Sequence, residues 1–229
     1  MKKAVLFLIF AAGVNSSALL FSDDYGSSES WASLGFEYGH FFESYSEREN
    51  IVESYTGSPG INFGGYRFWN GRNYGIFVHG LVAFPVINLE YTNDVGVKTG
   101  LGDYVMTLQT GMLIGPGFRY ALDKRLNFKF AVGVGFLSTL ILYTKYIPDK
   151  GDASYLIDKW SFGIGGDIGT KINITDNVFL SAGGIFTYDF LGHISMETPY
   201  GESSGWAWGF YMVGMRPYVA IGMNLQLEH

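Results

Sequence analysis

The sequence predicts an all-β protein, an eight-stranded antiparallel up-and-down transmembrane β-barrel, and three observations lead to this fold class. Glycine accounts for 32 of the 229 residues and aromatic residues for 17%, a composition typical of membrane barrels. Apolar residues alternate with small or polar residues over long stretches, which indicates strands with two different surroundings. Short and long connections also alternate, as in barrels whose tight turns all lie on one side of a membrane.

The alternation is clearest from residue 159 to residue 174, where the chain reads KWSFGIGGDIGTKINI. A helix would mix the apolar and polar sets, whereas a strand separates them onto two faces. One face carries Trp160, Phe162, Ile164, Ile168, Ile172 and Ile174. The other face carries Lys159, Ser161, Gly163, Gly165, Asp167, Gly169, Lys171 and Asn173. The same pattern predicts eight strands, at residues 31–43, 60–69, 74–87, 104–121, 126–143, 159–174, 178–191 and 206–226.

The connections fall into two classes. Tight turns are expected at residues 70–73, 123–125 and 175–177, which are built from residues that initiate turns. Longer polar segments lie near residues 44–59, 88–103, 144–158 and 192–205. We expect the turns at the periplasmic rim and the longer loops outside the cell, and the even strand number then returns both termini to the periplasm.

The direction of the two faces follows from side-chain volume and charge. The lumen of an eight-stranded barrel is barely wide enough for side chains, so the bulky aromatic residues are expected to face lipid. These are Phe36, Phe42, Phe84, Phe118, Phe128, Phe130, Phe136, Trp160, Phe162, Phe186 and Phe190. Small residues on the opposite face fit the lumen, among them Gly35, Gly39, Gly75, Gly111, Gly115, Gly117, Gly133, Gly135, Gly163, Gly165, Gly169 and Gly183. The predicted apolar faces carry no acidic residue, lysine or arginine, as a lipid-facing surface requires.

The second strand needs a correction of phase. Ile61 and Phe63 are out of phase with Tyr66 and Phe68, and a bulge at residues 64–65 would restore the register. Aromatic residues near the strand ends then suit interfacial girdles. The expected girdle residues are Tyr66, Phe68, Tyr74 and Tyr120 at the periplasmic side and Tyr104, Trp160, Tyr188 and Tyr211 at the outer side.

The two ends of the chain carry signals of export and of expression. Lys2 and Lys3 precede an apolar run and small residues at 16–18, which predicts a signal peptide over residues 1–18. We interpret residues 19–227 as one barrel domain and residues 228–229 as the remnant of a purification tag. The chain has no cysteine, so disulfides and thiolate metal sites are excluded.

With its strands placed, the chain resembles the small eight-stranded outer-membrane barrels, the class that holds OmpX, OmpW and the transmembrane domain of OmpA. The final strand ends Gly222-Met223-Asn224-Leu225-Gln226-Leu227, which is similar to the C-terminal signal of that class but lacks a terminal phenylalanine. The resemblance implies an outer-membrane location in a diderm bacterium and insertion by the barrel-assembly machinery. It is architectural and implies no activity.

Charged residues on the lumen face form the candidate site. They are Glu37, Arg67, Arg119, Lys129, Asp167, Lys171, Asp189 and Arg216. Charges enclosed by strand walls must pair to offset desolvation, yet five bases face three acids here. One interpretation is an ion-paired plug that fixes the strand register. The other is a constricted pore that prefers anions, and Glu37 with Arg216 is the pair expected to join the first and last strands.

An enzymatic function is the more specific alternative to these roles. His193-Ile194-Ser195 resembles the His-x-Ser pair of lipid A deacylases, with Ser195 as nucleophile, His193 as base and Glu197 or Glu202 as the orienting carboxylate. The strand pattern puts His193 and Ser195 in the lumen phase, whereas lipid substrates approach from the outer face. We therefore expect no catalytic site. His40 and His79 are too isolated to hold a metal, and no cofactor is expected.

The remaining expectations concern partners. A formal charge of −6 with acidic loops disfavours nucleic acid. Membrane lipid is the expected surrounding, with small solutes, apolar ones included, or extracellular molecules as ligands, and a monomer is expected. The sequence thus predicts a non-enzymatic barrel with a structural, surface-interaction or narrow passive-pore role.

Overall fold

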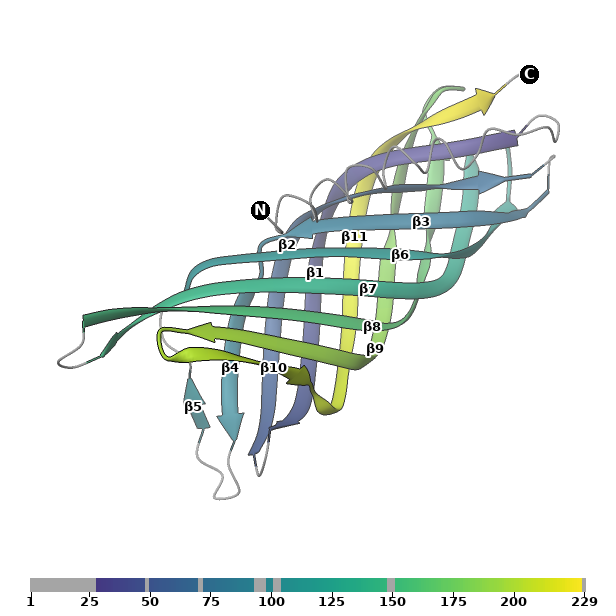
Figure 1. The fold of residues 1–229 in the computed structure, drawn as a ribbon. Helices are drawn as coiled ribbons and strands as arrows, with labels where there is room; N and C mark the ends of the chain where they lie inside the picture. The colour runs from purple at the N-terminus through teal and green to yellow at the C-terminus, as the bar shows by residue number, and fades with distance from the viewer. Residues whose placement is uncertain are drawn as a thin grey trace.

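The computed structural model describes residues 28–47, 50–69, 72–92, 98–100, 104–147 and 151–227. Eight long strands form a closed antiparallel ring in the order β1-β11-β9-β8-β7-β6-β3-β2, with β2 pairing back to β1 (Figure 1). They are β1 Ser28–Glu47, β2 Asn50–Phe68, β3 Tyr74–Ala83, β6 Tyr104–Ala121, β7 Leu126–Ile147, β8 Gly151–Asn173, β9 Val178–Thr198 and β11 Trp208–Leu227. The predicted eight-stranded antiparallel barrel is confirmed. The expected signal peptide and tag remnant lie outside the described residues.

The two ends of the barrel differ. Ser28 pairs with Leu227 at the end where the short β6–β7 and β8–β9 turns lie, which we call the turn end. In the β6–β7 turn, Oδ1 of Asp123 accepts hydrogen bonds from the backbone N–H groups of Arg125 (2.6 Å) and Leu126 (2.7 Å). In the β8–β9 turn, Oγ1 of Thr175 accepts from the N–H of Val178 at 3.0 Å. Side chains that satisfy turn N–H groups explain why these sequences reverse the chain so tightly.

The opposite end, which we call the hairpin end, differs from the sequence-based expectation. The segments predicted as long loops are largely strand, because β1 continues to Glu47, β2 starts at Asn50, β7 reaches Ile147 and β8 starts at Gly151. Three further strands lie here, β4 Val86–Thr92, β5 Lys98–Gly100 and β10 Gly201–Trp206. Ladder hydrogen bonds hold these hairpins without the apolar alternation that a membrane face imposes. Apolar alternation alone therefore made the predicted strands too short at the hairpin end.

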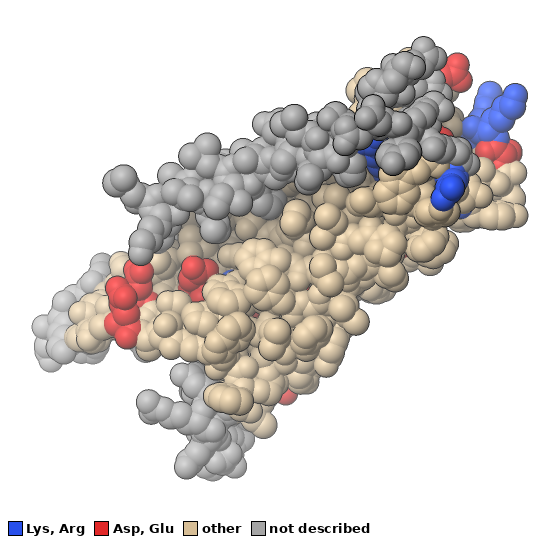
Figure 2. Space-filling view, turned by 45° about the vertical axis from the view of Figure 1, so that its right-hand side comes forward, with Lys and Arg blue, Asp and Glu red and all other residues tan. Residues whose placement is uncertain are grey.

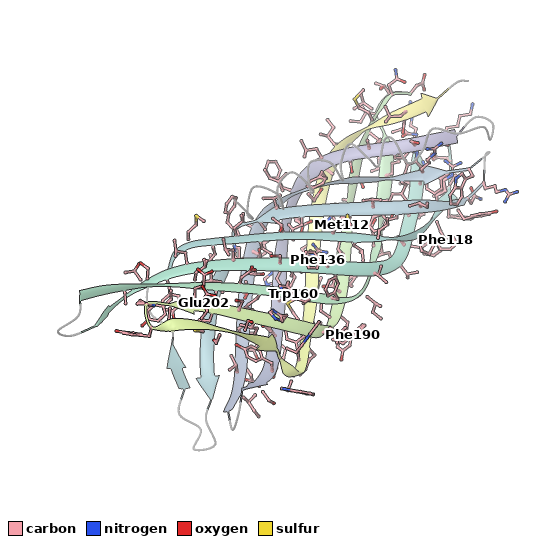
Figure 3. All side chains as sticks on the ribbon, in the orientation of Figure 1. Met112, Phe118, Phe136, Trp160, Phe190 and Glu202 are labelled. Atoms are coloured by element: carbon pink, nitrogen blue, oxygen red, sulfur yellow. The ribbon has the colours of Figure 1, made fainter. Side chains whose placement is uncertain are left out.

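The outer surface of the ring is apolar. Phe36 is 70% exposed, and Phe130, Ile164, Phe186 and Val219 are also exposed on the same side of the wall. Figure 2 shows a broad uncharged surface on the viewed face, with Lys and Arg gathered at one end of the barrel and acidic residues mostly toward the other. Met112, Phe118, Phe136 and Phe190 lie along this outward face (Figure 3). The expectation that these bulky aromatic residues point away from the lumen is confirmed.

The lumen is filled rather than hollow. Besides small residues it holds rings that the sequence analysis did not expect inside, namely Trp31, Phe41, Phe77, Phe179, Phe210 and Tyr218, all at most 8% exposed. Several of the lumen rings, that of Tyr66 included, lie against a glycine. A Cβ on Gly117 would lie 2.7 Å from the Tyr66 ring, and a Cβ on Gly214 would lie 2.8 Å from the Phe41 ring. Pairing large with small residues lets a narrow barrel pack aromatic side chains at high density.

Strand β2 corrects the expected bulge at residues 64–65. It pairs with β1 without a shift from Phe68 to Asn50, so one phase holds throughout. Ile61 faces outward, whereas Tyr66 and Phe68 are buried in the lumen and are not girdle residues. Arg67 consequently lies in the outward phase, near the turn end, and not in the lumen. The error arose because the lumen accepts aromatic rings wherever a glycine lies opposite.

A bulge does occur in β9. Phe162 pairs with Leu191 and Gly163 pairs with Asp189, so Phe190 has no cross-strand partner. The extra residue reverses the phase of β9 beyond this point. Ile194 and Met196 now pack inward, and His193 and Ser195 share the outward face with Trp160. The expectation that His193 and Ser195 lie in the lumen phase is wrong for this reason.

Within the described ranges, no helix is long and apolar enough to span a membrane.

Candidate functional site

The middle of the lumen holds a layer built on Glu37. Its Oε1 contacts Nη1 of Arg216 at 3.4 Å, and its Oε2 contacts Nε2 of His79 at 2.8 Å. The carboxylate side chain is fully buried and the guanidinium is 5% exposed. Strands β1, β3 and β11 supply the three residues, so the contact joins the first and last strands of the ring. His79, which seemed isolated in the sequence, is a partner of Glu37.

A second layer, nearer the turn end, is built on Asp167. Oδ2 of Asp167 contacts Nζ of Lys129 at 3.2 Å and accepts a hydrogen bond from the Tyr66 hydroxyl at 2.5 Å. The Tyr218 hydroxyl donates to Oδ1 at 2.7 Å. The Lys129 ammonium also lies 4.9 Å from the centre of the Tyr218 ring. One carboxylate thus ties β2, β7, β8 and β11 together across the lumen.

Two further ion pairs lie toward the ends of the lumen. Glu29 contacts Arg119 at the turn end, and Glu43 contacts Lys159 toward the hairpin end. The sequence-based network lacked Glu29, Glu43 and Lys159. Glu29 lies just before the predicted first strand, so counting inward positions two residues further back would have found it. With Arg67 outside, five basic residues face five acidic ones in the described lumen, and the expected excess of positive charge is corrected.

The last two charges of the lumen are not joined by an ion pair in the described part of the chain. Asp189 accepts a hydrogen bond from Ser161. The Lys171 ammonium lies 4.0 Å from the centre of the Trp31 ring and 4.9 Å from that of Phe179. Such contacts attract a cation but leave its N–H donors unused.

Free space in the lumen is small. A cavity of about 20 Å³ lies among the residues of the turn-end half, and another of about 30 Å³ lies between Phe41, Glu43 and Gln109. A water molecule needs roughly 10–15 Å³ measured this way, so the first cavity has room for one or two and the second for about two or three. Neither is a continuous aqueous channel.

The wall of the barrel changes on the hairpin-end side of Ala83. Up to that residue β3 pairs with β6, where Ala83 lies opposite Gln109. Strand β3 then ends, residues 84–85 belong to no strand, and β4 pairs with β2 and β5. Within the described residues no ladder joins β4 to β6, and Figure 1 shows β4 running beside β2 while β6 runs with β7 in another direction. We call this interruption the seam.

Pro85 explains where the seam starts. Proline has no N–H to give to a ladder, so it is found where strand pairing ends. The N–H of Phe84 donates to the carbonyl of Pro59 on β2 at 3.0 Å. From the other side, the Thr107 hydroxyl of β6 donates to the Pro85 carbonyl at 2.5 Å. A side-chain hydrogen bond therefore bridges the seam at the edge that lies toward the turn end.

Apolar side chains fill the lumen at the hairpin end. Val52 of β2 packs with Ile141 and Tyr143 of β7 and Ile157 of β8, all buried. Tyr45, Tyr155, Ile194 and Met196 pack against this group. The hairpin-end interior is thus apolar, in contrast to the ion-paired layers beneath it.

The residues of the enzyme hypothesis lie outside the lumen. The His193 ring stacks on Trp160 at 4.7 Å and meets the edge of Trp206 at 5.7 Å. Its Nδ1 is buried and has no hydrogen-bond partner within the described segments. In the described part of the chain, no hydrogen bond or ion pair joins His193 to Ser195 or Glu197. Trp160 and Glu202 mark this region in Figure 3.

Across the described ranges, no group of three or more His, Asp and Glu side chains is arranged to hold a metal ion.

Comparisons with known proteins bear on the fold. No protein-family model matches the chain, and no curated protein matches it. Among solved structures, OprG from Pseudomonas aeruginosa superposes with a TM-score of 0.56 at 9% identity, covering 89% of this chain and 98% of OprG. The chain has the fold of the small outer-membrane β-barrels. AlkL, solved in lipid bilayers, matches with a TM-score of 0.52 at 14% identity over 91% of this chain and 95% of AlkL. A major outer-membrane protein from Thermus thermophilus matches with a TM-score of 0.51 at 13% identity, over 85% and 99% of the two chains.

Proposed function

We propose that this protein is a non-enzymatic barrel of the outer membrane of a diderm bacterium that lets small apolar solutes pass sideways into the membrane. The seam between β4 and β6, lying above a plugged lumen, is the observation that carries this proposal. The chain ends at the turn end would face the periplasm, and the hairpin end would face outward. The barrel-assembly machinery would insert the chain, which acts as a monomer.

The Glu37 and Asp167 layers, which together plug the lumen, favour a lateral route through the wall over a route along the barrel axis. A hydrated solute that crossed the whole lumen would have to separate the Glu37 and Asp167 layers, whose carboxylates are fully buried. Removing one partner of a buried ion pair costs about 3–5 kcal/mol. Solutes entering from the hairpin end therefore meet a barrier at these layers, whereas at the seam no ladder of hydrogen bonds joins the described parts of β4 and β6.

The chemistry of the hairpin end selects the class of solute. The buried side chains there are aliphatic or aromatic, and an apolar solute loses no hydrogen bonds among them. Outside the seam, Val86 is 69% exposed and Met106 is 50% exposed. An apolar solute would pass from one apolar surface to the other at the level of Pro85.

Closing the seam by a cross-link tests the proposal. The chain has no cysteine, so Val86→Cys with Met106→Cys gives two unique thiols on either side of the seam. A reversible thiol cross-linker should slow the entry of an apolar naphthylamine dye, whose fluorescence rises in lipid, and reduction should restore entry. Val78→Cys with Ile114→Cys is the matched control, because these outward residues already pair in the β3–β6 ladder. Equal entry with the seam linked and free would rule out the lateral route.

Ion conductance separates this proposal from the narrow pore. A lumen closed by ion-paired layers should show no steady single-channel current in planar bilayers. A stable current that prefers anions would favour the pore, and binding of an extracellular molecule without any dye entry would favour a surface-interaction role.

The deacylase hypothesis gains one observation, since the β9 bulge turns His193 and Ser195 toward the outer face that a lipid would approach. The same geometry stacks the imidazole between tryptophans without an orienting carboxylate. A base that is not oriented by a third group lacks a main feature of hydrolase triads, and we therefore propose that the chain is not an enzyme.

A further inference from the structure

The cavity in the turn-end half of the lumen has an unusual lining. It is surrounded by Lys129, Lys171, His79 and Asn62, by the hydroxyl groups of Ser33, Ser181, Tyr66 and Tyr218, and by aromatic rings. No carboxylate is among the described residues that line it. A water site in a protein normally offers both donors and acceptors. The hydroxyl groups and the Asn62 amide of this cavity can act as both, but the charged side chains that line it, Lys129 and Lys171, are both cationic.

Two of these donors have no acceptor of their own. Asn62 is 2% exposed, and its Nδ2 has no hydrogen-bond partner among the residues that the structure describes. Lys171 is 1% exposed, and its ammonium contacts only the Trp31 and Phe179 rings among the described side chains. The nearby Glu29 carboxylate is held by Arg119 and by the Trp31 indole. Lys171 thus has no ion-pair partner of its own among the described residues, and a negative ligand would supply one.

The other polar groups are already occupied. The Lys129 ammonium is paired with Asp167 at 3.2 Å, and Nε2 of His79 is bonded to Glu37 at 2.8 Å. The Tyr66 and Tyr218 hydroxyls donate to Asp167. The free donors are therefore those of Lys171 and Asn62, which belong to β8 and β2 and meet at the same cavity.

We propose that this cavity binds a single halide ion, held by the Lys171 ammonium and the Asn62 amide. Its volume of about 20 Å³ limits the class of anion, since it has room for no more than one or two bodies of the size of water and so suits a single monatomic ion. Phosphate, sulfate and carboxylates are larger and are excluded. The ion would neutralise the unpaired lysine and link β8 to β2 across the lumen, as the Asp167 and Glu37 carboxylates do in their layers.

Bromide diffraction is the direct test. Crystals of the wild-type protein grown in bromide should show anomalous density within hydrogen-bond distance of Nζ of Lys171. The density should be lost in Lys171→Met, which keeps the length of the side chain and its contact with Trp31, and reduced in Asn62→Leu. Absence of bromide in the wild type, or equal bromide density in Lys171→Met, would overturn the proposal.

Thermal unfolding in detergent micelles gives a second readout without crystals. A ligand that binds only the folded state raises Tm with its concentration. Replacing gluconate by bromide at matched ionic strength should raise the wild-type Tm by about 3 °C or more once bromide is roughly tenfold above its Kd. Lys171→Met should lose this response. Lys159→Met is the matched control, because Lys159 is paired with Glu43 and does not line the cavity, so it should keep the response. A halide response that survives in Lys171→Met would sink the assignment.

Discussion

Replacing Arg216 by methionine is expected to destabilise the barrel by leaving Glu37 without its cationic partner. Both side chains are enclosed, with the carboxylate fully buried and the guanidinium 5% exposed. Methionine keeps the apolar volume of the arginine stem, so the change isolates the loss of charge. Among the described residues, Glu37 would then keep only the contact of its Oε2 with His79.

The magnitude follows from the geometry. Breaking a buried ion pair by removing one partner costs about 3–5 kcal/mol. The lower end applies here, because His79 still contacts Oε2 at 2.8 Å and the lost contact is 3.4 Å long. A loss of about 3 kcal/mol corresponds to a fall in Tm of roughly 6–12 °C for a chain of this size.

Urea unfolding in phospholipid vesicles, followed by tryptophan fluorescence, measures this effect. Glu37→Gln should also destabilise, since it strands Arg216, whereas the double variant Glu37→Gln with Arg216→Met should recover much of the loss. This recovery distinguishes a stranded charge from a damaged fold. An unchanged unfolding midpoint in Arg216→Met would refute the reasoning.

Three further predictions concern packing, a turn and chemistry. Gly117→Ala should cost about 1–3 kcal/mol, because its Cβ would lie 2.7 Å from the Tyr66 ring, whereas Gly184→Ala, whose Cβ would have its nearest neighbour at 3.6 Å, should be nearly neutral in the same urea assay. The N–H groups of Leu126 and Arg125 lower the pKa of the Asp123 carboxyl, and an NMR titration should find that lowered midpoint. The turn is therefore stabilised above the ordinary carboxyl pKa and loses this stabilisation as the pH falls through the lowered value. Asp123→Ala should increase proteolysis of the turn at neutral pH only. Ser195→Ala should leave the mass spectrum of lipid A in expressing cells unchanged, and a changed acylation pattern would support the deacylase hypothesis.

The fold could be predicted because lipid imposes a strict rule on one face of each strand. From Lys159 to Lys171 every second residue points inward, as the alternation predicts, and the structure keeps that phase. The rule is weaker where both faces accept aromatic residues. Tyr66 and Phe68 look like lipid-facing residues in the sequence, yet in the lumen Tyr66 lies against Gly117 and Phe68 packs against the Trp31 ring.

The candidate site was harder to predict because it depends on phase and on strand length. One misassigned phase in β2 brought Arg67 into the expected network, and a strand start set too late omitted Glu29. The bulge in β9 left a signal that could have been used. In the sequence, Phe190 and Leu191 are adjacent bulky apolar residues, and both can face lipid only if the strand carries an extra residue. In the structure they are 48% and 47% exposed.

Stability and passage should depend on different parts of this molecule. The Glu37 and Asp167 layers tie together strands that form a continuous ring, so their loss weakens the whole barrel. The seam lies where the ring is already open, with the Thr107 hydroxyl bonded to the Pro85 carbonyl at its base. Arg216→Met should therefore lower Tm without changing dye entry at temperatures where the barrel is folded, and the seam cross-link should slow entry without lowering Tm. Because the two sites share no residue, their effects should add in the combined variant. A cross-link raises Tm in general by constraining the unfolded chain. A seam cross-link that raised the Tm of Arg216→Met by clearly more than that of the unsubstituted barrel would show that the wall at the seam and the ion-paired layers move as one unit, which contradicts a fixed plug beside a separate lateral opening.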